Sequence, residues 1–221
     1  MKSILGVYGC GGLGREVLEL ARIINEREKR WVEIVFVVDN PTINEKDGAK
    51  VYDYNDAVKI FGNELEITIG IGEPASRWKV IEKVLSNSIP FATLVHPDVH
   101  IPESTKIGNG VTIQYGCYIS CGVEVSDFVF IQPQANIGHD TKLKKGCIVS
   151  GLCNLAGNVT VGENSYIGLG ANVMENMTIG EWSIISMAAA VYRPIPDSVI
   201  AVGNPARPMK NNEERTVFKC K

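Results

Sequence analysis

Residues 131–167 read IQPQANIGHDTKLKKGCIVSGLCNLAGNVTVGENSYI, and every sixth residue, starting from Ile131, is Ile, Leu or Val. The pattern continues in both directions, from Val95 to Val191, through seventeen positions spaced by six residues without interruption. Ile, Leu and Val account for only 59 of the 221 residues, so chance does not produce such a run. Strands alternate with a period of two and helices with a period of about 3.6, so a period of six indicates neither element alone.

A second position in each six-residue unit also follows a rule. Four residues after each aliphatic position, from Thr105 to Ala189, the residue is neither charged nor aromatic. Both features are typical of a parallel β-helix, in which three units close one triangular coil and successive coils stack. We therefore expect about five coils with interior columns, in which Ile137 is buried, whereas Lys145 should be solvated. One such column would contain Ile101, Ile119, Ile137, Leu155 and Val173.

The composition narrows the class of protein. The chain is 45% hydrophobic and 21% charged with a formal net charge of −3, which supports a sizeable core and excludes wholesale disorder. The sequence has no basic tract, which argues against nucleic acid as the main partner. No apolar run approaches the roughly 18 residues that a membrane span needs. The N-terminal segment is not typical of a secretory signal. Six cysteines without zinc-site spacing favour a reducing cytoplasm and no metal, and Cys117, Cys147 and Cys153 should be packing residues.

Residues 1–93 have a different pattern. The apolar run Ser3–Tyr8 precedes the glycine-rich segment 9–14, and residues 15–30 then have helical periodicity. Further strands are expected at 33–38 and 66–71, and further helices at 56–61 and 74–86. The succession of strand, glycine turn, helix and strand predicts a Rossmann-like domain with a parallel sheet.

The segment Gly9-x-Gly11-x-x-Gly14 has the form of a dinucleotide-binding fingerprint, and Asp39 ends the second expected strand. Glycines let the backbone approach a pyrophosphate, and the N-terminus of the following helix offers its amides. The residues alone leave three interpretations open: a nucleotide-sugar site, an NAD site, or a turn that serves packing only. The domain has about half the length of the full doubly wound fold and lacks an obvious hydride-transfer site, which favours the nucleotide sugar.

A Rossmann-like domain followed by a hexapeptide β-helix resembles the NeuD/PglD-type sugar acyltransferases of the hexapeptide-repeat family. This resemblance rests on the stretches Gly9–Glu16, Gly70–Arg77, Ile137–Asp140, Ala156–Gly162 and Val202–Arg207. It implies a nucleotide-sugar-binding domain at 1–93, a left-handed β-helix at 94–193 and a C-terminal tail at 194–221 near the CoA site. It also implies a cytoplasmic homotrimer with active sites between neighbouring subunits, serving the synthesis of bacterial surface glycans such as lipopolysaccharide.

Three histidines are candidates for a general base: His96, His100 and His139. His139 follows interior Ile137 by two residues, so it should project from the coil, and the adjacent Asp140 could orient its imidazole. His96 precedes Pro97 at the domain junction and His100 lies in the first turn of the β-helix, so both should be structural. The resemblance places the catalytic base at His139. Gly157 comes eighteen residues after His139 and should lie beside it on the next coil, about 4.8 Å away. In the family, the amide of the matching glycine contacts acetyl-CoA.

The resemblance assigns the remaining site residues to two groups. The residues expected to bind acetyl-CoA are Gly157, Gly168, Leu169, Ser186, Met187, Asn204, Pro205, Ala206 and Arg207. The residues expected to bind the nucleotide sugar are Gly9, Gly11, Gly12, Gly14, Asp39, Asn40, Gly72, Glu73, Arg77 and Gln132. The chain departs from some relatives at Gln132, where they have asparagine, and at 186–188, where they have glycines.

The resemblance implies direct, metal-independent acetyl transfer from acetyl-CoA to the amino group of a nucleotide-linked sugar, such as a 4-amino sugar. His139 would accept the proton and Gly157 would stabilise the oxyanion. Two alternatives stay open. The protein could acetylate a hydroxyl of a sialic-acid-type sugar, or it could be a non-catalytic, nucleotide-binding scaffold. The choice between UDP, GDP and dTDP also stays open.

Overall fold

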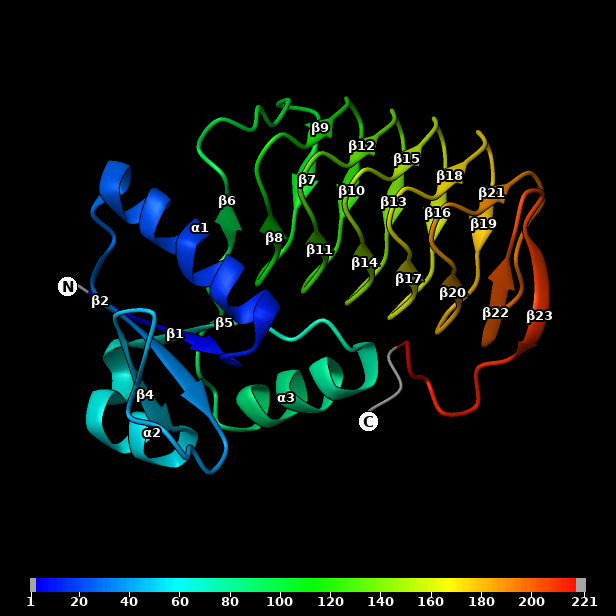
Figure 1. Cartoon of the computed structure of the whole chain (residues 1–221). Coiled ribbons are helices and arrows are strands. Elements are labelled where there is room, and N and C mark those ends of the chain that lie inside the picture. The colour runs from blue at the N-terminus through cyan, green and yellow to red at the C-terminus, as the bar shows by residue number, and fades with distance from the viewer. Residues whose placement is uncertain (1–2, 218–221) are drawn as a thin grey trace. The chain divides into compact units, whose positions relative to one another are not determined.

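The structure is a computed structural model that describes residues 3–217 (Figure 1). Its contacts divide the chain into two compact units. The front unit contains the residues up to Gly72 together with Ser76–Pro97, and the second unit contains Glu73–Ala75 and the residues from Asp98 onward. Among the described residues, no helix is long and apolar enough to cross a membrane.

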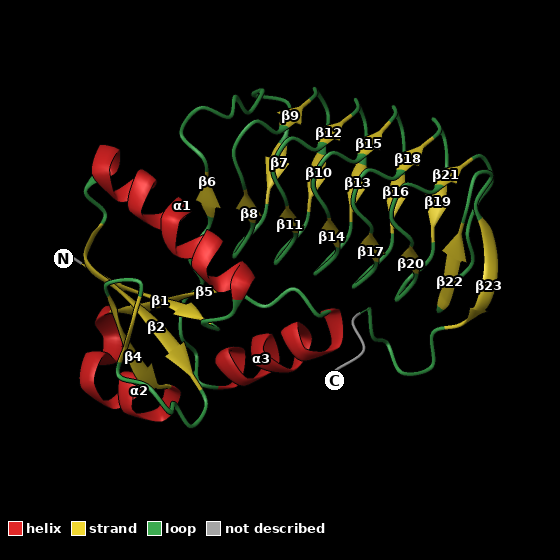
Figure 2. Cartoon of the chain, viewed as in Figure 1, coloured by secondary structure: helices red, strands yellow, loops and turns green. Residues whose placement is uncertain are grey.

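The front unit is a Rossmann-like sheet with helices on both faces. Its parallel strands β4, β2, β1 and β5 lie side by side in this order, and β3 adds an antiparallel edge. Crossovers run in opposite directions from β1 to β2 and from β4 to β5, so α1 and α2 cover opposite faces (Figure 2). The strands are β1 (Ser3–Tyr8), β2 (Trp31–Val38), β3 (Glu45–Lys46), β4 (Ala49–Asp53) and β5 (Leu65–Ile69). The helices are α1 (Gly12–Glu28), α2 (Tyr54–Phe61), the 3-10 turn η1 (Gly62–Glu64) and α3 (Pro74–Ser86).

The β3–β4 hairpin was not predicted from the sequence. Its turn is Asp47-Gly48, with φ values of 47° and 71°, and an Asp-Gly pair is a strong sequence signal for such a two-residue turn. Arg15 and Arg22 of α1 both bind Asp47, which ties the hairpin to that helix. The helix α1 also begins at Gly12, earlier than the expected position 15, because Gly11 already adopts the extended backbone of an N-cap residue.

The second unit is a left-handed parallel β-helix of five coils, and its two-residue strands form three faces (Figure 1). The short strand β6 (Leu94–Val95) precedes it. The first face contains β7 (Lys106–Ile107), β10 (Glu124–Val125), β13 (Lys142–Leu143), β16 (Thr160–Val161) and β19 (Thr178–Ile179). The second contains β8 (Thr112–Ile113), β11 (Phe130–Ile131), β14 (Ile148–Val149), β17 (Tyr166–Ile167) and β20 (Ile184–Ile185), extended by β22 (Val199–Val202) and β23 (Arg207–Asn211). The third contains β9 (Tyr118–Ile119), β12 (Asn136–Ile137), β15 (Asn154–Leu155), β18 (Asn172–Val173) and β21 (Ala190–Val191).

The register confirms the period of six residues. Strands pair with the strand eighteen residues further along, as Ile137 does with Leu155. Every aliphatic position from Ile113 to Val191 is buried. Val95, Ile101 and Ile107 are only partly buried, because the coils that would cover them on one side end there. Lys145 was expected to be solvated, but it is partly buried, and its ammonium lies 5.6 Å from the centre of the Phe128 ring.

The coils turn through a left-handed backbone position that also recurs every six residues. All fourteen such positions from Gly110 to Ala188 have positive φ, and nine of them are Gly, Asn or Asp, the residues that adopt this conformation most readily. Asp140 occupies one of them, with φ of 57°. Each set of turns stacks into an edge of the prism. We call the turns containing 138–140 and 156–158 the His139 edge, and those containing 132–134, 168–170 and 186–188 the Met187 edge.

Candidate active site

His139 and Asp140 form the turn between β12 and β13 on the His139 edge. The Nδ1 atom of His139 lies 2.9 Å from Oδ2 of Asp140, and the two side chains are 61% and 67% exposed. The amide of Asp140 donates a hydrogen bond to the carbonyl of Cys121 on the preceding coil, 3.1 Å away, which fixes the turn. When Nδ1 carries the proton and donates it to the carboxylate, Nε2 is the atom that can accept a proton from a ligand.

The imidazole of His139 lies against Gly157, one coil further along. A Cβ atom on Gly157 would collide with Nε2 and would lie 2.5 Å from Cε1. The two turns are also joined by their backbones, since the Asn158 amide donates to the His139 carbonyl over 2.7 Å. Within residues 3–217, the amide of Gly157 itself has no hydrogen-bond acceptor. Only glycine at 157 leaves room for the histidine in this orientation.

The Met187 edge holds a second group of the predicted site residues. Gly168 and Ser186 lie on adjacent coils, and a Cβ on Gly168 would lie 2.8 Å from the Ser186 carbonyl carbon. Leu169 and Met187 are 50% and 72% exposed. Gln132 lies on the same edge, where its side-chain oxygen accepts the Gly151 amide over 3.2 Å, so this oxygen already has a structural partner.

The two groups of residues are not brought together within one chain. His139 and Gly157 lie on one edge of the triangular prism, and Gly168 and Ser186 lie on another, with the whole third face between them. Within one chain, the two groups therefore lie on different edges of the β-helix.

The tail segment predicted to bind CoA is partly built into the β-helix. The amide of Ala206 donates to the Ala190 carbonyl over 2.7 Å, and the Ala206 side chain is buried. Asn204, Pro205 and Arg207 are exposed. Ala206 is thus a packing residue of the tail, and the three exposed neighbours remain candidates for ligand contact.

The glycines of the front unit divide into two kinds. A Cβ on Gly14 would overlap the carbonyl oxygen of Gly9, and a Cβ on Gly70 would lie 2.6 Å from the Cα atom of Gly14. These glycines let the turn, helix α1 and the end of β5 pack closely. A Cβ on Gly11 or Gly12 would meet nothing within 4 Å. Gly11 and Gly12 therefore leave open space at the N-terminus of α1. This end of the helix follows β1, next to the point between β1 and β5 where the strand order changes direction, and α/β sheets bind ligands at such points.

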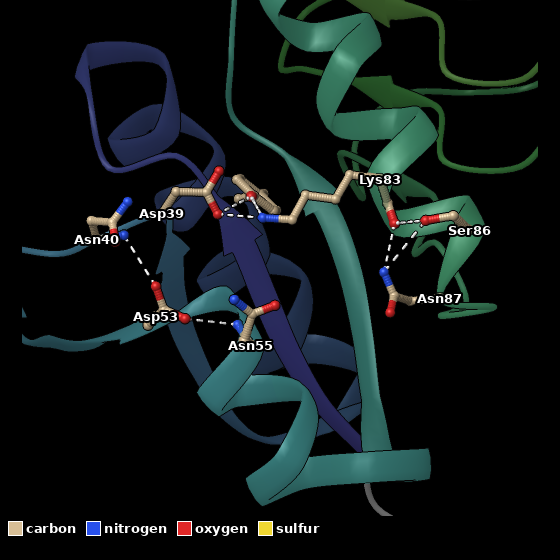
Figure 3. A network of polar contacts seen from close by, with 8 residues as sticks. Asp39, Asn40, Asp53, Asn55, Lys83, Ser86 and Asn87 are labelled. Carbon is tan, nitrogen blue, oxygen red and sulfur yellow. Dashed lines mark hydrogen bonds and ion pairs between the residues drawn. The ribbon is translucent and has the colours of Figure 1, made fainter.

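Asp39 and Asn40 follow β2 and belong to a network of polar contacts (Figure 3). Oδ1 of Asp39 accepts hydrogen bonds from the Tyr8 hydroxyl, 2.8 Å away, and from the Lys83 ammonium, 2.5 Å away. The Asn40 amide donates to Asp53 over 3.1 Å, and this bond is the largest cause that lowers the pKa of Asp53. Burial and the bond to Asp39 raise the pKa of Tyr8, so its hydroxyl remains a donor.

Two residues predicted to contact the substrate have structural partners within the chain. Arg77 is 1% exposed and donates to the carbonyl of Ile69 at the end of β5, so it cannot reach a ligand in solvent. Glu73 accepts a hydrogen bond from the Val217 amide, 2.9 Å away. The neighbouring Gly72 is half-buried.

The core cysteines are not poised as nucleophiles. Burial raises the pKa of Cys117 and of Cys153 to about 11, so both remain thiols near neutral pH. Each thiol donates to a carbonyl, that of Gln132 and that of Gly168 respectively. Across residues 3–217, His, Cys, Asp and Glu side chains form no group of three that could hold a metal ion.

Known proteins share both units. Residues 5–84 match the family of PglD N-terminal domains. The GDP-perosamine N-acetyltransferase of Escherichia coli O157:H7 is 26% identical over 219 residues, which cover 95% of this chain and 98% of that protein. The acetyltransferase domain of PglB from Neisseria gonorrhoeae FA1090, solved with acetyl coenzyme A, superposes with a TM-score of 0.87 at 28% identity, covering 95% of this chain and 100% of that one.

PerB from Caulobacter crescentus, solved with CoA and GDP-perosamine, superposes with a TM-score of 0.85 at 27% identity, covering 95% of this chain and 98% of that one. Variants of that perosamine N-acetyltransferase, with one histidine changed to asparagine or alanine, were solved with the same two ligands.

The fold and these similarities define a hexapeptide-repeat protein with a Rossmann-like front domain. Within that class, the chain is of the NeuD/PglD type, which confirms the resemblance seen in its sequence motifs.

Proposed function

We propose that this protein transfers the acetyl group of acetyl-CoA to the amino group of a nucleotide-linked sugar. The arrangement of His139, Asp140 and Gly157 on one edge of the β-helix is the observation that carries the proposal. It is supported by the relatives, whose names and ligands include GDP-perosamine N-acetylation, acetyl coenzyme A and CoA. The reaction belongs in the cytoplasm, in a route to surface glycans such as lipopolysaccharide.

His139 acts as the general base. Its Nδ1–H donates to Asp140, so Nε2 accepts the proton that the sugar amine loses as its nitrogen attacks the thioester carbon. A C–N bond forms and the carbonyl oxygen becomes an oxyanion, which the amide of Gly157 stabilises. The carbonyl then re-forms, the C–S bond breaks, and the CoA thiolate leaves and takes up the proton from Nε2 of His139, which restores the base. No covalent enzyme intermediate is needed.

The site is completed between two copies in a homotrimer. The His139 edge of one copy supplies His139 and Gly157, and the Met187 edge of its neighbour supplies the channel for CoA. Gly168, Leu169, Ser186 and Met187 line that channel, and the exposed tail residues Asn204, Pro205 and Arg207 contact the CoA nucleotide.

The front domain holds the nucleotide. Gly11 and Gly12 give the diphosphate access to the first amides of α1, and Asp39 accepts hydrogen bonds from the nucleoside. GDP is the first nucleotide to test because two of the relatives carry GDP-perosamine in their names or structures. We infer that the acceptor nitrogen is the 4-amino group of the sugar.

A direct test measures release of CoA from acetyl-CoA in the presence of GDP-, UDP- or dTDP-linked 4-amino sugars. We expect CoA release with one of them and a product that is acetylated on nitrogen, as read by mass spectrometry and NMR. A product acetylated on oxygen would instead establish a sugar O-acetyltransferase. No CoA release with any acceptor, despite nucleotide binding, would establish a non-catalytic scaffold and overturn the proposal.

Mixing two inactive variants tests the shared site. His139→Asn disables one edge and Ser186→Trp blocks the other, so neither homotrimer should turn over. Trimers that are reassembled from an equal mixture should regain about a quarter of the wild-type activity, since one interface in four combines two intact edges. Absence of any recovery from trimers shown to be mixed would place the whole site within one copy.

A further inference from the structure

The carboxylate of Asp39 is held on one side only. Its Oδ1 atom accepts hydrogen bonds from Tyr8 and Lys83, whereas no group within residues 3–217 donates to Oδ2. Figure 3 shows this second oxygen pointing away from the Lys83 ammonium. The Asp39 side chain is 48% exposed, so Oδ2 is accessible to a ligand.

Lys83 is itself fixed in place from several sides. It projects from α3, and its ammonium lies 2.5 Å from Asp39, 3.3 Å from the Tyr8 hydroxyl and 4.3 Å from the centre of the Tyr54 ring. An aromatic face attracts a cation and restricts where it can lie. The pair of Lys83 and Asp39 is therefore oriented before any ligand binds, although a half-exposed ion pair adds little to stability.

The backbone beside Asp39 is anchored as well. The Asn40 amide donates to Oδ2 of Asp53, whose Oδ1 accepts the Asn55 amide at the start of α2. This cap ties the loop after β2 to the helix α2. Both the side chain and the backbone of Asp39 are therefore held in place, and Oδ2 stays accessible.

We propose that Lys83 is a positioning residue for nucleotide binding, which holds Asp39 so that Oδ2 accepts hydrogen bonds from the ribose hydroxyls of a nucleoside diphosphate. This inference rests on the proposed function. Tyr8, which binds Asp39, directly precedes Gly9 of the turn expected to hold the diphosphate, so the ribose is the part of the ligand nearest to Asp39. Lys83 also offsets the negative charge that Asp39 would otherwise present to the diphosphate.

The test compares binding of GDP and 2′,3′-dideoxy-GDP by calorimetry in the wild type, Lys83→Met and Lys83→Arg, with UDP and 2′,3′-dideoxy-UDP used if UDP binds more tightly. If dTDP binds more tightly, it is compared with its 3′-deoxy form, which lacks the one sugar hydroxyl that dTDP has. Lys79→Met is the matched control, because Lys79 is an exposed lysine one turn earlier on the same helix. In the wild type, removal of both hydroxyls should weaken binding by at least about tenfold, as expected for hydrogen bonds to a charged group.

In Lys83→Met, we expect GDP to bind about tenfold more weakly and the loss on removing the hydroxyls to shrink to within about twofold. Lys83→Arg should restore much of that difference, and Lys79→Met should behave as the wild type. If Lys83→Met bound the dideoxy nucleotide as much more weakly as the wild type does, only the proposed role of Lys83 would be overturned. The same would follow if the wild type bound both nucleotides equally well. Failure of the wild type to bind GDP, UDP or dTDP would overturn the nucleotide-sugar function as well.

Discussion

The imidazole of His139 occupies the space that a side chain on Gly157 would fill, eighteen residues further along the chain. A parallel β-helix makes this relationship possible because residues separated by one coil lie next to each other for the whole length of the stack. The glycine therefore determines the orientation of the histidine, and the histidine explains why the position needs a glycine.

Gly157→Ala should displace the His139 ring and lower kcat by about 10- to 100-fold, because a small misplacement of a general base has large effects on rate. The added methyl group collides with the end of a side chain rather than with the backbone, so the melting temperature should stay within a few degrees of the wild type. The double variant with His139→Asn should be no slower than His139→Asn alone. A further loss in the double variant would assign Gly157 a role independent of the histidine.

His139→Asn should lower kcat by about 10²–10⁴, since a positioned general base contributes rate factors of this size. Asp140→Asn should lower kcat by a smaller factor, because it removes the carboxylate that favours protonation at Nδ1 but leaves Nε2 in place. Steady-state kinetics with acetyl-CoA and the preferred sugar measures both effects, and size-exclusion chromatography checks the assembly. Near-normal turnover by His139→Asn would exclude His139 as the base.

Two glycines of the same turn should respond in opposite ways to alanine. Gly14→Ala should lower the free energy of unfolding by at least about 2 kcal/mol, because its Cβ overlaps the Gly9 carbonyl. Gly11→Ala meets no atom within 4 Å, so its stability should change by no more than about 0.5 kcal/mol. It should nevertheless raise the KM for the nucleotide sugar, by about tenfold, if the diphosphate approaches this backbone. An unchanged KM would place the diphosphate elsewhere.

The buried thiols should make the protein less stable in alkali. Burial holds the pKa of Cys153 at about 11, above the ordinary value of 9.0 that applies in the unfolded chain. Below pH 9 both states keep the proton, so the stability is complete, and as the pH rises toward 11 only the unfolded state loses it. The free energy of unfolding should fall over this range, and Cys153→Ala should reduce the slope. An identical slope in wild type and variant would contradict the burial argument.

The β-helix was predicted well from the sequence because the period of six is repeated at every interior position, whereas its left-handed form was implied only by the family resemblance. It did not predict the fate of Arg77, which the resemblance assigned to the substrate site but whose side chain bonds the Ile69 carbonyl at 1% exposure. A motif match gives the residue type and not the direction in which the side chain points.

Lys83 was missed for a related reason. No local pattern marks a lysine in the last turn of α3 as a partner for Asp39, since the two residues are 44 positions apart and meet only through the sheet topology. The β3–β4 hairpin was also missed, but it could have been predicted from the sequence. Its Asp47-Gly48 dipeptide favours the positive φ values that a tight hairpin turn needs.

The interior register can be tested without reference to catalysis. Ile137 is fully buried between Ile119 and Leu155 in the third face, so an aspartate there has neither water nor a partner. Ile137→Asp should lower the free energy of unfolding by at least about 3 kcal/mol, measured by chemical denaturation. Thr178→Asp is the matched control, because Thr178 is exposed on the first face, and it should change stability by no more than about 0.5 kcal/mol. If Thr178→Asp unfolded the protein while Ile137→Asp melted with the wild type, the interior and exterior positions would have to be exchanged.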